Sequence, residues 1–409
     1  MSVPEGWHIN QLEELALVER GKFSVRPRND SRYFGGNIPF VQTGDIGAAN
    51  TYLTCYSQTL NEDGLKVSKL FPKNSILITI AANIGDTAIT TFDVACPDSV
   101  VAIQPFKDKA DYFWLKMVLE TCKDDLDSKS TQNAQKNINL QVLKPLLIRT
   151  PPLPEQKKIA RILSTWDRAI EVAEKLLNNS RQQKKALMQQ LLTGKKRLPG
   201  FNGKWKKVNI GNVVHIASGK SKSKFINENG ERYIIDMGSI SREGKLIPSK
   251  KTDLDEDYLL HEQLVMPKDD IGGGNIIGRV GFIDQDRKYV LGDHVYALYV
   301  HGCDSLFLCY LINHDTVNKS LRRKANGTAQ LGLGKKDVEK QPVYIPNTKE
   351  EQQKIASVLS AANKEIEILE QKLGCLRQEK KALMQQLLTG KRRVKVDGSE
   401  APEKEAARA

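Results

Sequence analysis

Two long segments of the chain carry apolar residues at the three- and four-residue spacing of an amphipathic helix. Nine positions in each segment fit the inner seam of a coiled coil, and one of the nine is a lysine. The pattern predicts two long helices that pack against each other through these positions. The two seams are Leu163, Trp166, Ile170, Ala173, Leu177, Ser180, Lys184, Leu187 and Leu191, and Leu359, Ala362, Ile366, Leu369, Leu373, Leu376, Lys380, Leu383 and Leu387.

The two helical segments are copies of each other. The run KKALMQQLLTGK occurs unchanged at 184–195 and at 380–391. The wider similarity, from Glu155 to Arg197, returns without a gap 196 residues later. A repeat at fixed spacing indicates a duplicated unit. The chain is therefore predicted to consist of two variable blocks of about 150 residues, each followed by one helix.

Local signals mark where each helix begins and ends. Thr348 followed by Glu351 has the spacing of a capping box, and Pro154 suits the first turn of the earlier copy. Each copy stops at a Thr-Gly pair, as expected for a helix that ends on glycine. Ser164 and Ser360 can cap a second helical piece, so we expect a kink at these positions.

The block before each helix has the signature of a mixed α/β domain. Apolar runs at 75–80 and 98–103 predict strands, as do the surroundings of Val41 and Ile46, while 111–122 predicts a helix. Glycine and proline separate these runs. The second block repeats the order with weaker identity at 233–235, 238–240, 277–278 and 293–297.

Geometry predicts how the helices pair. The second block joins the end of one helix to the start of the next, and the ends of a compact domain usually lie close together. Antiparallel packing brings these two points together, so the predicted fold class is α+β: two similar mixed α/β domains separated by an antiparallel coiled coil, with pseudo-twofold symmetry. The expected segments are a first domain at 1–152, a central helix at 153–197, a second domain at 198–346, a C-terminal helix at 347–394 and a disordered tail at 395–409.

The chain is basic, with 62 lysines and arginines against 49 aspartates and glutamates, a net charge of +13. A solvated basic surface would account for such an excess. Clustering of the cations favours a polyanionic partner instead, most simply nucleic acid. The clusters are Lys204, Lys206 and Lys207; Lys220, Lys222 and Lys224; Arg322, Arg323 and Lys324; and Lys335 and Lys336.

Cysteine usage and hydropathy narrow the class of protein further. The six cysteines form no CxxC pair and match no zinc spacing, which is typical of reduced thiols in a cytosolic protein. The histidines are scattered without metal-ligand spacing. No apolar run approaches the roughly 20 residues that a membrane span requires. We therefore expect a soluble cytoplasmic protein with no metal and no cofactor of its own.

Candidate catalytic motifs fail on their spacing. Gly219-Lys220-Ser221 resembles a phosphate-binding loop, but Val214 stands where that loop needs a glycine. The glycines at 272–274 miss the dinucleotide-binding spacing, and the acidic run at 267–270 lacks the partner residues of a nuclease site. The Asn-Pro-Pro-aromatic tetrapeptide that an adenine methyltransferase would need is absent. These observations predict a protein without its own catalytic site.

Several short motifs stand beside the order of blocks and helices: LPEQKKIARIL at 153–163, TKEEQQKIASVL at 348–359, IPFVQTGDI at 38–46, and the pairs Ala134-Gln135 and Ala329-Gln330. With that order, they make the chain resemble the DNA specificity subunit of type I restriction-modification enzymes, over nearly the whole chain. Two variable blocks alternate with two near-identical helices in that family.

The resemblance implies a division of labour. Each variable block would be a target recognition domain that reads one half of a bipartite site in double-stranded DNA. The helices would dock two modification subunits, which bind S-adenosylmethionine and methylate adenine, and restriction subunits would join them for cleavage. The first block departs slightly from the pattern, with 133–136 reading NAQK where 327–330 reads GTAQ.

Two other functions remain open at this point. A stand-alone two-headed DNA-binding regulator would use both blocks but would leave the apolar positions outside the helix seam without a purpose. A pure coiled-coil scaffold would not need two diversified basic blocks.

Base edges in the major groove are read by arginine or lysine on guanine and by asparagine or glutamine on adenine. Loop residues of these types are the DNA-binding candidates, with phosphate contacts as the simpler role for any single one. Gln135 and Gln330 have a structural alternative, in which they bond a loop to the core. The candidates are Arg26, Arg28, Asn29, Arg32, Gln42, Asn83, Asn133, Gln135, Lys136 and Asn137 in the first block, and Lys220, Lys222, Lys224, Arg242, Asn275, Arg279, Arg322, Arg323, Asn326, Gln330, Lys335 and Lys336 in the second.

Apolar residues outside the seam suggest a second contact face on each helix. A two-helix coil does not need such a face, so we predict that it docks the modification subunits. The docking candidates are Ile159, Ile162, Met188 and Leu192 in the first helix, and Ile355, Val358, Met384 and Leu388 in the second.

Overall fold

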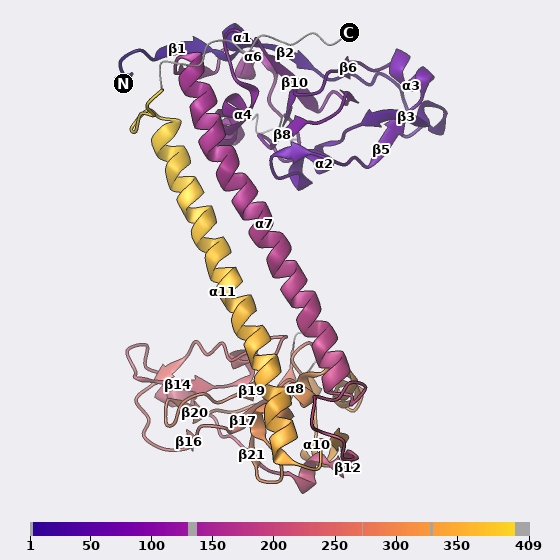
Figure 1. The fold of residues 1–409 in the computed structure, drawn as a ribbon, viewed down its shortest axis with the longest axis vertical. Coiled ribbons are helices and arrows are strands. Elements are labelled where there is room, and N and C mark those ends of the chain that lie inside the picture. Colours follow the sequence, from indigo (N-terminus) through magenta and orange to yellow (C-terminus); the bar gives the residue numbers. More distant parts are fainter. Residues whose placement is uncertain (1–2, 130–136, 272, 328–329, 397–409) are drawn as a thin grey trace. The chain divides into compact units, whose positions relative to one another are not determined.

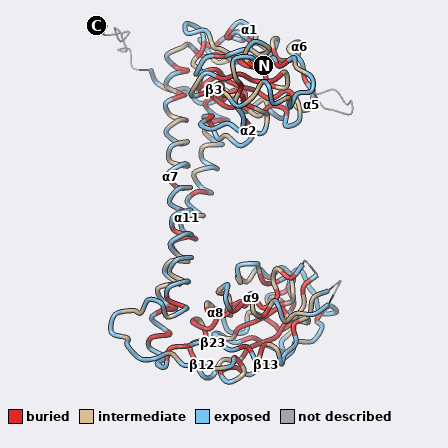
Figure 2. The backbone as a smooth tube through the Cα atoms, turned by 90° about the vertical axis from the view of Figure 1, so that its right-hand side faces the viewer, coloured by how far each residue is buried: buried red, intermediate tan, exposed pale blue. Residues whose placement is uncertain are grey.

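The structure of the protein is a computed structural model, drawn in Figure 1. Figure 2 shows its buried residues concentrated in the sheets of the domains. Within the described ranges, the longest helices remain too polar to cross a membrane. The described residues are 3–129, 137–271, 273–327 and 330–396.

The chain divides into two compact units. Unit 1 comprises Met1–Glu174 and Lys372–Ala409, and unit 2 comprises Lys175–Gln371. The division cuts through the two long helices, α7 (Leu153–Leu191) and α11 (Lys349–Leu387). Each unit therefore holds one mixed α/β domain together with part of α7 and part of α11.

The domain of unit 1 contains short strands and helices around two sheets. In chain order its elements are β1 (His8–Gln11), α1 (Leu12–Leu15), β2 (Ala16–Arg20), a 3-10 helix (Ser31–Tyr33), β3 (Phe34–Phe40), α2 (Thr43–Ala48), β4 (Tyr52–Leu53), β5 (Gln58–Leu60), α3 (Glu62–Lys66), β6 (Leu70–Phe71), β7 (Ile76–Thr79), β8 (Thr87–Thr90), β9 (Val94–Ala95), β10 (Val100–Pro105), α4 (Tyr112–Thr121), α5 (Lys123–Ser128), α6 (Leu140–Leu143) and β11 (Leu147–Thr150). One sheet has the order β2-β10-β7-β8-β4, the other β5-β3-β9-β6, and β1 pairs with β11.

The domain of unit 2 repeats this plan. Its elements are β12 (Lys206–Asn209), a 3-10 helix (Ile210–Asn212), β13 (Val214–Ser218), a 3-10 helix (Ser223–Phe225), β14 (Arg232–Ile235), a 3-10 helix (Met237–Ser239), β15 (Lys251–Thr252), β16 (Tyr258–Leu259), β17 (Leu264–Pro267), β18 (Asp269–Asp270), β19 (Gly281–Phe282), β20 (Tyr289–Leu291), β21 (Val295–Val300), α8 (Ser305–Asn313), α9 (Asp315–Arg322), β22 (Leu331–Gly332), α10 (Lys335–Glu339) and β23 (Pro342–Ile345). The order β13-β21-β17-β19 matches β2-β10-β7-β8 of unit 1, and β12 pairs with β23 as β1 pairs with β11.

Several predicted elements are confirmed and others are wrong. The run 75–80 contains β7, 98–103 contains most of β10, and 111–122 contains α4, whose start is capped by the Asp111 side chain. Ile46 was expected in a strand, but it lies buried in helix α2. The run 238–240 likewise lies largely in a 3-10 turn and not in a strand.

The two long helices pack antiparallel in both units, as predicted. In unit 1, Arg377 Nη2 lies 2.7 Å from Glu174 Oε1, and Lys380 pairs with Asp167, so residue numbers rise along one helix as they fall along the other. In unit 2, Leu191 and Leu192 share a core with Ile355 and Leu359, near the opposite ends of the same helices. Buried positions follow the predicted seam, with Leu163, Ala173, Leu177, Leu359, Ile366 and Leu373 all buried.

The kinks expected at Ser164 and Ser360 are wrong, because α7 and α11 are each continuous. The Ser164 hydroxyl donates to the Arg161 carbonyl, 3.0 Å away, within the same helix. The Ser360 hydroxyl instead lies 3.0 Å from the hydroxyl of Tyr310 in α8. Both hydroxyls are satisfied without a break in the backbone ladder.

In unit 1, a buried glutamate at the start of α7 joins three parts of the chain. Glu155 is 2% exposed. Its carboxylate accepts hydrogen bonds from Arg393 Nε and Nη2, at 2.7 and 2.8 Å, beyond the end of α11. It also accepts one from Trp7 Nε1 at 3.1 Å. A charge removed from water is stable only when paired and hydrogen-bonded, and these three bonds supply both conditions.

Unit 2 contains the same arrangement, which corrects one prediction. Glu351 is 3% exposed, and its carboxylate accepts from Arg197 Nε and Nη2, both at 2.7 Å, and from Trp205 Nε1 at 3.4 Å. The Thr348 hydroxyl accepts the Glu351 N–H at 3.4 Å, as in a capping box. The return bond from the Glu351 side chain to Thr348 is replaced by the bonds to Arg197 and Trp205. We call each set of one glutamate, one arginine and one tryptophan a glutamate clamp.

The glutamine after each clamp glutamate ties the helix to the domain. Gln156 accepts the N–H of Asp111, the residue that caps α4, at 2.9 Å. Gln352 accepts the N–H of Asp304, the cap of α8, at 2.7 Å. Both glutamines are buried. The Glu-Gln pair at the start of each long helix therefore fixes that helix to the capping aspartate of α4 in unit 1 and of α8 in unit 2.

The lysine in the seam has a different environment in each unit. In unit 1, Lys380 pairs with Asp167, which also accepts from the Thr51 hydroxyl at 2.9 Å. The residue equivalent to Asp167 in unit 2 is Asn363, which donates to the Tyr310 hydroxyl at 2.8 Å. Burial lowers the pKa of Lys184, the lysine of unit 2. An ion pair thus joins the two helices at this position in unit 1, whereas in unit 2 the residue equivalent to Asp167 is a neutral amide that bonds α11 to α8.

Replacing Glu351 by Gln should destabilise unit 2 by about 2 kcal/mol, because Arg197 and Trp205 lose a charged acceptor in a buried site. Glu155→Gln should have the same effect on unit 1. Glu350→Gln is the matched control, since Glu350 is exposed beside the clamp. Urea unfolding gives the loss of free energy, and hydrogen exchange locates it. Unfolding of Glu351→Gln at the midpoint of the control would show that the clamp contributes no stability.

Candidate nucleic-acid interface

The candidate arginines of unit 1 lie in the segment before β3, and two of them already pair with acids. Arg28 Nη2 is 2.8 Å from Asp98 Oδ1, and Arg32 Nη2 is 2.7 Å from Asp30 Oδ2. The Arg28 and Arg32 side chains are 51% and 78% exposed. A DNA contact by these residues would therefore add to, or exchange with, a surface ion pair. Arg26 and Asn29 are exposed in the same segment.

The candidate amides of unit 1 fall in two places. Gln42 precedes α2, and its Nε2 donates to Gln58 Oε1 at 3.0 Å. Asn83 lies exposed in the turn between β7 and β8, and Asn137 forms a β-bridge with Ala81 in the same turn. The structure therefore places Asn137 beside the turn that holds Asn83, although 54 residues of sequence separate the two asparagines. Asn133, Gln135 and Lys136 lie outside the described residues.

The lysine triplet of unit 2 does not act as one group. Lys220 and Lys224 are exposed, whereas Lys222 is buried. Lys222 Nζ lies 2.5 Å from Asp257 Oδ2 and 3.5 Å from Glu256 Oε1. The hydrogen bond that Lys222 donates to Asp257 raises the pKa of Lys222. Lys222 holds its loop against the acidic segment before β16, so its predicted role in DNA contact is corrected to a structural one.

Arg279 is also held within the domain. Its Nη1 donates to the Asn313 carbonyl, at the end of α8, at 2.6 Å. Burial lowers the pKa of Arg279, as does the positive charge of Arg322 to a smaller extent. The Arg279 side chain therefore positions the loop after β18 against α8. Asn275, in the same loop, is half-buried, and Arg242 is exposed in another loop.

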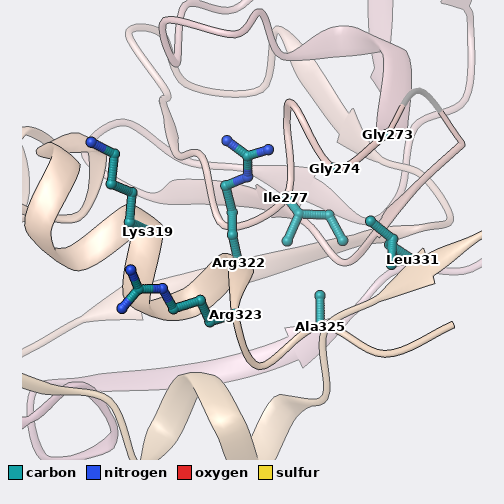
Figure 3. Close-up of a pocket in the computed structure, with 8 residues that line it drawn as sticks. All are labelled: Gly273, Gly274, Ile277, Lys319, Arg322, Arg323, Ala325 and Leu331. Atoms are coloured by element: carbon teal, nitrogen blue, oxygen red, sulfur yellow. The ribbon is translucent and has the colours of Figure 1, made fainter.

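Arg322 and Arg323 end helix α9 and line a cavity of about 270 Å³ (Figure 3). Lys319, one turn earlier, lines the same cavity. We call this cavity the α9 pocket. Its remaining lining residues are Gly273, Gly274, Ile277, Ala325 and Leu331.

The remaining candidates of unit 2 lie around the turn that leads into α10. Asn326 and Gly332 exchange backbone hydrogen bonds of 3.0 and 2.8 Å, and Gln330 is exposed in the turn between them. Lys335 Nζ is 3.7 Å from Glu339 Oε1 within α10, and Lys336 is exposed. Asn326, Gln330 and the α9 pocket therefore lie near one another at one edge of the domain.

Sequence reasoning missed Lys319 and the apolar part of the α9 pocket. Lys319, Arg322 and Arg323 are spaced three and four residues apart, so they share one face of a helix. That spacing in the sequence could have identified Lys319 as a neighbour of the two arginines. Ile277 and Leu331 come from distant parts of the sequence, and only the tertiary fold places them in the same cavity.

The eight docking candidates pack against the domains of their own units, which corrects that prediction. Five of them are buried, and Ile162, Met188 and Val358 are half-buried. Ile159, Ile162, Met384 and Leu388 pack with the core of unit 1, and Met188, Leu192, Ile355 and Val358 with the core of unit 2. The off-seam face therefore seats each helix on its domain. Three other apolar residues of the helices are exposed: Val172 by 52%, Leu176 by 50% and Ile368 by 55%. Val172 and Ile368 occupy equivalent positions, 196 residues apart.

Within the described parts of the chain, no three side chains of the metal-binding types gather at one point. The buried thiols lie in apolar surroundings, which raises the pKa of Cys309 to about 12. A thiol that stays protonated is a poor nucleophile and a poor metal ligand.

The chain is similar in sequence to known proteins. A family model described as the type I restriction modification DNA specificity domain matches residues 4–179 and 202–377. The chain is 26% identical to the type I restriction enzyme MjaVIII specificity subunit of Methanocaldococcus jannaschii, over 97% of this chain and 95% of that protein. It is 25% identical to the putative type I restriction enzyme MjaX specificity subunit of the same organism, over 96% and 95%.

Solved structures share the fold. The crystal structure of the S subunit of a type I restriction-modification system from M. genitalium matches with a TM-score of 0.65 at 15% identity, over 95% of this chain and 98% of that chain. A structure described for the assembly and conformational transition of the type I R-M system matches with a TM-score of 0.55 at 14% identity, over 95% and 99%.

Replacing Lys222 by Ala should lower the stability of unit 2 by about 1 kcal/mol, the size of a favourable ion pair at a partly exposed site. Because the pKa of Lys222 is raised, its contribution is present below about pH 10.5 and is lost as pH rises through the raised value. Thermal melts across this range should show that loss in the wild type and not in the variant. Lys220→Ala is the control, and equal melting of both variants would contradict the structural role.

Proposed function

The chain belongs to the type I restriction modification DNA specificity family, and from that premise we propose a role for each domain and for the helix pair. It is a specificity subunit of a type I restriction-modification system. We propose that each domain reads one half of a bipartite target in double-stranded DNA. The helix pair docks modification subunits, and S-adenosylmethionine, the methyl donor, belongs to those subunits. This chain supplies recognition and no catalytic group.

One observation carries the proposal. The two domains share a sheet order and a helix attachment, yet the residues on their surfaces differ. A shared scaffold with unlike surfaces is what two separate readers of unlike half-sites require. The net charge of +13 supports a DNA partner, because phosphate neutralisation supplies much of protein–DNA affinity. A stand-alone DNA-binding regulator would share these features but would bind no modification subunit.

Exchanging residues 1–152 for the matching block of a relative should change one half of the methylated sequence and leave the other half unchanged. The exchange must retain Trp7, Thr51 and Asp111, because these residues join the domain to the helices of unit 1. Sequencing of methylated adenines in cells that carry the modification subunits reads out both halves. The reciprocal exchange of 198–346 serves as the control. A simultaneous change in both halves would rule out independent readers.

The docking surface follows from the exposed helix residues. Val172 and Ile368 present the same apolar position of the repeat to solvent, one in each unit. Leu176 adds a second exposed apolar residue to α7. Val172 and Leu176 are four residues apart and share one face of α7, and a contiguous exposed apolar patch, unlike a single exposed residue, marks a site of protein contact. We propose that these residues, and not the buried off-seam set, contact the modification subunits.

The double variant Val172→Glu, Ile368→Glu should weaken association with the modification subunit by at least tenfold, about 1.4 kcal/mol. A charge placed in an apolar interface loses its hydration without gaining a partner. Ile247→Glu, at an exposed apolar residue of the unit 2 domain, is the matched control. Co-purification and titration measure the association. Full retention of the modification subunit by the double variant would exclude this helix face as the docking surface.

A further inference from the structure

The α9 pocket combines positive charge with an apolar floor. Lys319, Arg322 and Arg323 come from the last turns of α9, and Ile277 and Leu331 are among the apolar residues beside them (Figure 3). The cavity therefore offers hydrogen-bond donors on one side and carbon surface on the other. Its ligand should be an anion joined to an apolar group.

A glycine allows the pocket to form. Gly274 has φ of +77°, and a Cβ built there would lie 2.9 Å from Leu331 Cδ1 and 3.8 Å from Arg322 Nη2. Any side chain at this position would be strained and would push into the cavity. The loop before Ile277 can thus lie close beside the guanidinium of Arg322.

The positively charged side chains that line the α9 pocket have few acidic partners. Lys319 has a surface partner, Asp315, at 3.2 Å. Among the described residues, neither Arg322 nor Arg323 has a carboxylate within ion-pair distance. Arg279, whose pKa Arg322 helps to lower, adds a like charge nearby. An anion in the pocket would relieve this repulsion.

A second pocket lies in unit 1, and its positively charged residues are paired with acids. It is smaller, about 140 Å³, and is lined in part by Lys116 and Lys123. Each of these lysines has an acid beside it: Lys116 Nζ is 2.7 Å from Glu120, and Lys123 Nζ is 2.5 Å from Asp86. Gly85, the counterpart of Gly278 in unit 2, lines that pocket too. Related loops therefore enclose a neutralised pocket in unit 1 and a positively charged one in unit 2.

The shape of the pocket determines whether it can bind a base edge or a phosphate of DNA. Base edges lie at the bottom of a groove, so a protein reaches them with a projecting element. Phosphates lie on the outer surface of the duplex, where a recess in the protein can receive them. Arg322 lines a recess, which suits it to a phosphate more than to a base edge.

We infer that the α9 pocket seats one phosphodiester of the DNA backbone, with Arg322 on the phosphate, Arg323 adding positive charge at the rim, and Ile277 and Leu331 against the adjoining deoxyribose. The inference rests on the proposed DNA-reading function and assigns these two arginines a positioning role. The contact sets the register of the unit 2 domain on the duplex, and neighbouring loops read the bases. Unit 1 has no equivalent anchor at its own pocket.

The test measures DNA affinity of the full chain against salt concentration for Arg322→Ala, Arg323→Ala and the double variant. The slope of log affinity against log salt should flatten by about one unit when the protein no longer neutralises this phosphate. Affinity should fall by a similar factor for target and non-target duplexes, since a phosphate carries no sequence information. Arg322→Lys should retain the slope, because an ammonium group also binds phosphate.

Two controls remove a cation elsewhere. Lys340→Ala removes an exposed lysine just after α10, and Lys123→Ala removes a lysine that lines the pocket of unit 1. Both should leave the slope closer to that of the wild type than the α9 variants do. Equal flattening by Lys340→Ala would mean that general charge, and not the pocket, produces the effect, and would overturn the inference.

Three further outcomes would contradict either the phosphate assignment or the proposed function. An unchanged slope with reduced discrimination between sequences, and no rescue by Arg322→Lys, would make Arg322 a base reader. A 2-aminopurine signal that depends on Arg322 would show that the pocket receives an extruded base. Either result overturns the phosphate assignment while the proposed function stands. Failure of the wild-type chain to bind DNA, alone and with its modification subunits, would instead overturn the proposed function.

Discussion

The buried carboxylate at the start of each long helix is the interaction on which the rest of the structure depends. Glu155 and Glu351 are almost completely removed from water, and each would cost several kcal/mol without partners. An arginine and an indole N–H from other parts of the chain meet that requirement in each unit. Because its partners are fixed, the glutamate determines where the helix begins, where the other helix ends and how the domain sits on both.

The repeat separates what must stay constant from what can change. Between the two copies the clamp, the adjacent glutamine and the apolar seam are retained, and these residues account for the attachment of domain to helix. The differences lie elsewhere: Asp167 becomes Asn363, and the Lys116–Glu120 ion pair within α4 has no ionic counterpart in α8. Charged residues outside the clamp can therefore differ between the units without loss of the framework, which suits a chain with two domains that are proposed to read unlike half-sites.

The parts of this fold that sequence predicts are those governed by local periodicity. The seam from Leu163 onward and the strands β7 and β10 follow from spacing and composition, since the same residues decide both pattern and burial. Periodicity shows that a helix face is apolar but not what covers it, so Ile159 and Met384 were assigned to a partner when their own domain buries them. The sequence likewise shows where charged residues stand but not what they contact. Lys222 and Lys220 look alike in sequence, and only the fold places Asp257 beside one of them.

Unit 1 is assembled from two stretches of chain, and this has a consequence for biosynthesis. Glu155 and its partner Arg393 are 238 residues apart in sequence, with the whole of unit 2 between them. At about 5 to 20 residues per second, roughly 10 to 50 s pass between the synthesis of the two. Unit 2 is a continuous stretch and can close first, while the N-terminal domain waits with its helix-binding surface uncovered. The part of the protein made first is thus completed last.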